Sequence, residues 1–94
     1  MSEPKNDVAM PAGMTYPCEF PLKVFIKPDE DVAARIAGLA RAQLAAEASM
    51  EVTRRSSSTG KFLALTINFV AEDPAHLDRV IKAVTADPGV LLAL

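Results

Sequence analysis

The fold of this chain is decided by residues 61–70, which read KFLALTINFV. Large apolar side chains alternate there with smaller or polar ones, and a period of two is typical of a strand with one buried face. The predicted buried face carries Leu63, Leu65, Ile67 and Phe69. The opposite face carries Phe62, Ala64, Thr66 and Asn68. The pattern therefore predicts a strand that lies inside a sheet and lines a core with one side only.

Two further strands are predicted upstream of this one. Residues 56–60 read SSSTG and predict a turn, in which Gly60 is free to adopt a positive φ angle. Residues 50–55, before the turn, predict a weaker strand at a sheet edge. A strongly alternating strand begins at Phe20 and ends before Pro28. Its apolar positions are Phe20, Leu22, Val24 and Ile26, and its other face carries Lys23, Phe25 and Lys27.

Two helices are predicted between the strands, and each is opened by an acidic residue that can cap free backbone amides. The first begins at residues 29–31, DED, and runs to about Ala48. The second begins at residues 73–74, Asp-Pro, and is ended by residues 87–89, DPG. Residues 90–94 then form a last strand. The predicted buried stripes are Val32, Ile36, Leu39 and Gln43 or Leu44 in the first helix, and Leu77, Val80, Ile81 and Val84 in the second.

The elements follow one another in the order βαββαβ. Short connections and right-handed crossovers favour the split βαβ arrangement for that order. We therefore predict an α+β, ferredoxin-like fold, with a four-stranded antiparallel sheet, two helices on one face, and the first and third strands in the centre. Residues 1–15 show no hydrophobic period and predict a flexible N-terminal tail, so the domain is expected to span residues 16–94.

Composition excludes several functional classes. Ninety-four residues suffice for one core, and a net charge of −2 disfavours a protein that grips nucleic acid mainly through phosphates. The single cysteine, Cys18, cannot form an internal disulfide, and no apolar run reaches the length of a signal peptide or a membrane span. We therefore expect a soluble, cytoplasmic protein without membrane contact.

Short motifs connect this sequence to a family. They are Tyr16-Pro17-x-x-Phe20-x-x-Lys23, residues 57–62, SSTGKF, and residues 65–67, LTI. With these motifs, most of residues 16–94 resembles the YbeD-like family of small bacterial proteins of unknown function. The resemblance implies a ferredoxin-like fold similar to ACT-type regulatory domains, which bind small effectors or pair with copies of themselves, and it supplies no catalytic residues. The turn at residues 27–29, KPD, lacks the glycine of ACT-type ligand sites, which argues against amino-acid binding in that manner.

The chain offers no recognisable catalytic or metal-binding constellation. His76 is expected on the polar side of the second helix as a plain surface residue, and Cys18 lies away from any base. One cysteine and one histidine are too few for a zinc site, and the acidic residues 29–31 lack the spacing of an EF-hand. Residues 59–61, TGK, have neither the spacing nor the strand-to-helix setting of a phosphate loop. We therefore predict a non-enzymatic protein without metal or cofactor.

The hairpin at residues 54–61 gathers basic and hydroxyl side chains that suit an anion. The candidate anion-binding residues are Arg54, Arg55, Ser57 and Lys61. The same residues also fit a solvated hairpin whose charges protect an edge strand from pairing, and this interpretation is favoured because edge protection is the commoner use.

The face of the sheet that the helices leave uncovered is the most informative feature. Its candidate interaction surface is Lys23, Phe25, Lys27, Arg55, Phe62 and Thr66, and Thr53, Ala64, Asn68, Leu91 and Ala93 are expected on the same face. An exposed apolar patch of this kind marks a protein–protein surface more often than other sites, unless the tail covers it. We therefore predict a regulatory or interaction module that binds a protein partner, a second copy or a small effector. The alternative is a single-stranded RNA-binding domain that stacks bases on Phe25 and Phe62, although the acidic chain and the poor RNP1 match argue against it.

Overall fold

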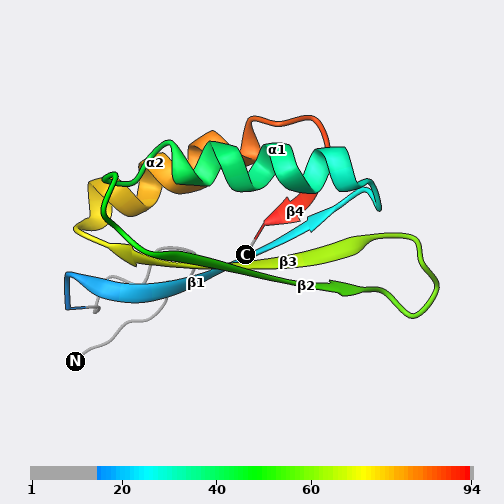
Figure 1. The fold of residues 1–94 in the computed structure, drawn as a ribbon, viewed down its shortest axis with the longest axis horizontal. Coiled ribbons are helices and arrows are strands. Elements are labelled where there is room, and N and C mark those ends of the chain that lie inside the picture. Colours follow the sequence, from blue (N-terminus) through cyan, green and yellow to red (C-terminus); the bar gives the residue numbers. More distant parts are fainter. Residues whose placement is uncertain (1–14, 94) are drawn as a thin grey trace, which may run out of the picture.

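The computed structural model describes residues 15–93, so the predicted tail lies, apart from Thr15, outside the described residues. The elements are β1 (Cys18–Ile26), α1 (Glu30–Arg41), β2 (Met50–Ser56), β3 (Leu63–Ala71), α2 (Pro74–Thr85) and β4 (Val90–Ala93). The four strands form one antiparallel sheet in the order β2-β3-β1-β4, and both helices cover the same face of it (Figure 1). The predicted ferredoxin-like α+β fold is confirmed, with β1 and β3 in the centre.

The core lies between the helices and the inner face of the sheet. β1 and β3 pair along their whole lengths, from Cys18 opposite Ala71 to Ile26 opposite Leu63. Paired residues share a face, so the two alternating patterns place their large apolar side chains together against the helices. The fully buried large side chains are Leu22, Val24, Ile26, Ile36, Leu65, Ile67, Leu77, Val80 and Val84.

Both helices begin where an aspartate caps them. The Asp29 carboxylate accepts hydrogen bonds from the backbone N–H groups of Asp31 at 2.8 Å and of Val32 at 3.4 Å. The Asp73 carboxylate accepts from the N–H of His76 at 2.8 Å, with Pro74 in the first turn. These bonds satisfy amides that have no partner inside the helix. The acidic residues 29–31 therefore have a structural use at the start of α1.

The first helix is shorter than predicted, because it ends at Arg41 and not near Ala48. The Arg41 guanidinium donates hydrogen bonds to the backbone carbonyls of Ala45, Ala46 and Ala48. An alanine-rich segment has a high helix propensity, but these contacts hold the chain in a compact turn after the helix. Propensity alone therefore placed the helix end too late.

The prediction that His76 is a plain surface residue is wrong, since only 5% of it is exposed. Its Nδ1 atom accepts a hydrogen bond from the backbone N–H of Glu72 at 3.0 Å. The Nε2 atom must then carry the proton of the neutral ring, and it donates to the carbonyl of Gln43 at 2.9 Å. The ring also stands edge-on against Phe69, with the centroids 6.2 Å apart. His76 therefore ties the start of α2 to the segment that follows α1.

A second tie joins α1 to the turn before β4. The Arg35 guanidinium binds the Asp87 carboxylate through two hydrogen bonds, of which the Nη2–Oδ1 bond is 2.9 Å long. The Asp87 carboxylate also accepts the N–H of Gly89 at 2.8 Å. The guanidinium first, and then that N–H group, lower the pKa of Asp87 from 3.8 to about 2. This contact spans 52 residues and fixes where the last strand begins.

Candidate interaction surface

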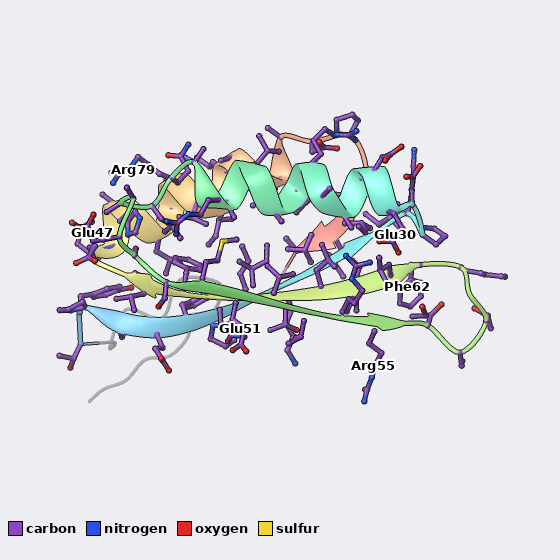
Figure 2. All side chains as sticks on the ribbon, viewed as in Figure 1. Glu30, Glu47, Glu51, Arg55, Phe62 and Arg79 are labelled. Atoms are coloured by element: carbon purple, nitrogen blue, oxygen red, sulfur yellow. The ribbon has the colours of Figure 1, made fainter. Side chains whose placement is uncertain are left out.

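The open face is the side of the sheet that the helices leave uncovered, and three strands supply most of it. In Figure 2 the labelled side chains of Glu51 and Arg55, both on β2, lie on the side of the sheet away from the helices. The pairing gives three rows across this face. They are Glu51–Asn68–Pro21, Thr53–Thr66–Lys23 and Arg55–Ala64–Phe25. The predicted surface residues Lys23, Phe25, Arg55, Phe62 and Thr66 therefore belong to one face.

An aromatic pair occupies one end of the open face. The ring centroids of Phe25 and Phe62 lie 5.5 Å apart at an interplanar angle of 40°. Phe25 pairs with Ala64, whose small side chain leaves room beside the ring. The hairpin holds Phe62 in place, because its N–H donates to the Ser57 hydroxyl at 3.2 Å and its carbonyl accepts the N–H of Ser57 at 3.0 Å. Phe62 is nevertheless 37% exposed, so its ring is available to a partner.

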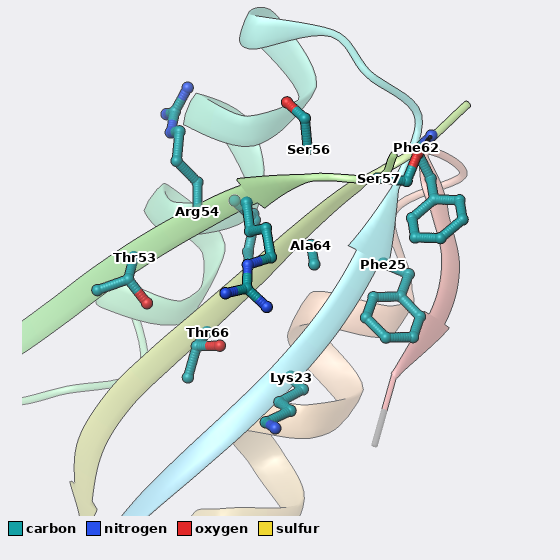
Figure 3. Close-up of a pocket in the computed structure, with 11 residues that line it drawn as sticks. Lys23, Phe25, Thr53, Arg54, Ser56, Ser57, Phe62, Ala64 and Thr66 are labelled. Carbon is teal, nitrogen blue, oxygen red and sulfur yellow. Dashed lines mark hydrogen bonds between the residues drawn. The ribbon is translucent and has the colours of Figure 1, made fainter. Parts of the chain in front are cut away.

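A groove of about 580 Å³ runs across this end of the face (Figure 3). Its walls include Lys23, Phe25, Thr53, Arg55, Phe62 and Thr66. Within residues 15–93, neither Lys23 nor Arg55 forms an ion pair with another side chain. Two cations beside two aromatic rings suit a partner that presents both a carboxylate and an apolar group.

A second groove, of about 420 Å³, lies at the other end of the same strands. Its walls include Glu19, Glu51, Asn68 and Val70. Neither carboxylate forms an ion pair among the described residues. One end of the open face is therefore basic and aromatic, whereas the other is acidic.

The structure divides the predicted anion-binding hairpin between the two faces of the sheet. Arg54 lies opposite the buried Leu65 and forms an ion pair with Glu30 at the start of α1. Figure 3 shows its side chain directed away from Lys23 and Phe25. Arg54, Arg55 and Ser57 are all among the residues that line the basic groove, and Lys61 lies in the turn outside it. The structure therefore separates Lys61 from the other three predicted residues, and Glu30 engages the guanidinium of Arg54.

The last strand contributes one residue that the sequence did not predict for the open face. The register changes at a bulge between Phe25 and Ile26, so that Leu92 pairs with Phe25 and Ala93 pairs with the buried Val24. The prediction that Ala93 shares the face of Phe25 is therefore wrong, because the bulge shifts the alternation. Leu91 lies at the bulge, has no paired residue in β1 and is 55% exposed. Leu92 is 50% exposed and extends the apolar patch to the sheet edge.

Lys27 and Cys18 contribute little to the grooves. Lys27 follows the last residue of β1, is exposed, and donates its backbone N–H to the carbonyl of Gly89 at 3.2 Å. Cys18 begins β1 and is partly buried. Among residues 15–93, no group of three His, Cys, Asp or Glu side chains could hold a metal ion.

Comparison with known proteins identifies the family of this chain. Residues 11–94 match the model of a family described as "Protein of unknown function (DUF493)". The chain belongs to the DUF493 family. Curated DUF493-like relatives carry the name UPF0250 protein, and the predicted resemblance to the YbeD-like family of small bacterial proteins is confirmed.

Relatives of this DUF493 chain match it over most of their length. The UPF0250 protein of Chromobacterium violaceum is 30% identical over 94 residues, and the match covers 100% of both chains. That of Paraburkholderia phymatum is 33% identical over 79 residues, which cover 84% of this chain and 89% of the relative. The solution structure of protein HP0495 from H. pylori is 14% identical, with a TM-score of 0.63 over 96% of this chain and 98% of that one. This likeness supports the fold. In the described part of the DUF493 chain, no helix is long and apolar enough to cross a membrane.

Proposed function

We propose that this domain is a non-enzymatic interaction module that binds a protein partner through the open face. The observation that carries the proposal is the exposed apolar patch of Phe25, Phe62 and Leu92, next to Lys23 and Arg55, two cations that form no ion pair within residues 15–93. Large apolar side chains that remain in water on a sheet face are typical of a surface that another protein covers.

The surroundings of His76 and Cys18, the two side chains most often used in catalysis, favour a role in binding over a role in catalysis. Both ring nitrogens of His76 are engaged with backbone groups in a buried position, so the ring is not free to exchange protons with a substrate. Within residues 15–93, Cys18 forms no hydrogen bond with His76, because Glu72 and Gln43 engage both ring nitrogens of that histidine.

The geometry of the aromatic pair favours a protein over single-stranded RNA. RNA-binding sheets stack separate bases on separate rings, whereas Phe25 and Phe62 contact each other in a tilted pair. The open face also carries Glu19 and Glu51, whose carboxylates would repel phosphates. The groove residues instead match a protein surface with mixed charges and apolar side chains.

A small anionic effector is a second candidate, because Lys23 and Arg55 line the same groove as the two rings. A ligand that binds only the folded state raises the unfolding midpoint in proportion to the logarithm of its concentration over its dissociation constant. Thermal unfolding by circular dichroism, against a panel of amino acids, nucleotides and phosphorylated metabolites, tests this. A saturable shift that is lost in Arg55→Ala supports the effector, and no shift with any of these ligands contradicts it.

The interaction function is tested by comparing what immobilised variants retain from a bacterial lysate. Phe62→Asp places a charge in the apolar patch, and Arg79→Asp is the matched control on the helix side of the molecule (Figure 2). We expect proteins retained by the wild type and by Arg79→Asp to be lost with Phe62→Asp, and circular dichroism establishes that both variants fold. The proposal fails if the two variants retain the same proteins as the wild type.

A further inference from the structure

The charges of the open face change sign about one row of residues. That row is Thr53–Thr66–Lys23, one residue from each of the three long strands. On β2, Glu51 lies two residues to one side of the row and Arg55 two residues to the other. On β1, Glu19 lies four residues to one side of Lys23, and Lys27 lies four residues to the other side in the same alternation. After a half-turn about the row, opposite charges therefore meet on either side of it, whereas Lys23, which lies in the row itself, meets Lys23 of the second copy.

The apolar residues follow the same rule. Phe25 and Pro21 lie at equal distances on either side of Lys23 in β1. Phe62, which immediately precedes β3, and Val70, within β3, lie at equal distances on either side of Thr66. A half-turn about the row would thus lay each phenylalanine on a smaller apolar residue, and the basic aromatic groove on the acidic groove.

We propose that the partner of the open face is the same face of a second copy of this chain, related by a two-fold axis along the row Thr53–Thr66–Lys23. This inference rests on the proposed function of the open face and names its partner. Arg55 then faces Glu51 of the second copy, and the symmetry makes this contact twice. Two sheets that pack face to face lie about 10 Å apart, a gap that an arginine and a glutamate can span together.

The size of the face indicates a weak dimer. Strands about 4.8 Å apart with a rise of about 3.3 Å per residue give three strands a face of about 400 Å², or on the order of 800 Å² for two copies. Stable interfaces bury at least about 1,200 Å² in total, so this dimer is expected to exchange and to form at high protein concentration. Exposed ion pairs weaken as salt is added, so the association is also expected to fall with ionic strength.

A charge exchange between two positions tests the arrangement. Arg55→Glu places glutamate against Glu51 twice, and Glu51→Arg places arginine against Arg55 twice, so each variant alone should dimerise about tenfold or more weakly. An equimolar mixture of the two variants restores both opposite-charge contacts within one heterodimer. Sedimentation velocity, with a fluorescent label on one variant, measures each association. Neither side chain forms an ion pair within residues 15–93, so the exchange leaves the fold intact.

The expected result is weak self-association of each variant and recovery of the dimer in the mixture. A wild type that stays monomeric up to its solubility limit overturns the inference, as do single variants that self-associate like the wild type. A wild-type monomer combined with partner loss in Phe62→Asp would mean that a different protein binds the open face. A monomer with no such loss would mean that both proposals fail.

Discussion

Replacing His76 tests the buried bridge that joins α2 to the segment after α1. His76→Leu introduces an apolar side chain of similar size, and it removes the acceptor for the N–H of Glu72 and the donor to the carbonyl of Gln43. A buried hydrogen bond contributes about 1 kcal/mol, and an unpaired buried partner costs up to about 3 kcal/mol. Since solvent reaches only 5% of the residue, we expect the free energy of unfolding to fall by about 2–4 kcal/mol.

Urea unfolding followed by circular dichroism measures this loss. With an m-value of about 1 kcal/mol per molar, the midpoint should fall by about 2–4 M. Two variants divide the effect, because the amide oxygen of His76→Asn can replace Nδ1 and the amide nitrogen of His76→Gln can replace Nε2. Each of these two variants should lose about half of the unfolding free energy that His76→Leu loses. If His76→Leu unfolds within about 0.5 kcal/mol of the wild type, the two hydrogen bonds do not stabilise the domain.

Glycine and pH offer further tests. Gly89→Ala should destabilise the domain by about 1–3 kcal/mol, because the new Cβ would stand 2.5 Å from Cγ1 of the buried Val32. Gly38→Ala, with nothing within 4 Å of the new Cβ, should instead stabilise α1 by about 0.5–1 kcal/mol, and thermal midpoints in the opposite order would refute both expectations. The folded pKa of Asp87 is about 2, below 3.8, so the unfolded chain binds this proton first as the pH falls. The stability from its pair with Arg35 should therefore be present above about pH 4 and lost towards pH 2. In Asp87→Asn, the unfolding midpoint should fall less steeply between these pH values. An equally steep fall in the variant would exclude this carboxylate as the cause.

Sequence patterns predicted the features of the fold that depend on neighbouring residues. The alternation in residues 61–70 gave the buried face of β3, and an aspartate at 29 and at 73 marked the start of each helix. These features are local, since a strand shows its buried face every second residue and a helix shows its cap immediately before its first turn.

Features that depend on particular side-chain contacts were not predictable from propensity and periodicity. The end of α1 depends on carbonyls that Arg41 meets four to seven residues later, and the burial of His76 depends on Gln43, 33 residues away. Asp87 could be recognised as a helix breaker, but its ion pair with Arg35 requires the tertiary fold. The bulge beside Phe25 likewise placed Leu92 on the open face and Ala93 opposite the buried Val24, although the aromatic pair itself followed from the predicted strand order.

The order of the strands has a consequence for how the chain is made. β1 is synthesised first, yet both strands that flank it, β3 and β4, come later, and Cys18 pairs with Ala71. An emerging chain therefore holds an apolar strand with two unpaired edges until residues 63–71 have left the ribosome. The hairpin of β2 and β3 is the first part of the sheet that can form, so β1 inserts between strands of later origin, and the sheet is complete only after residues 90–93 have been synthesised.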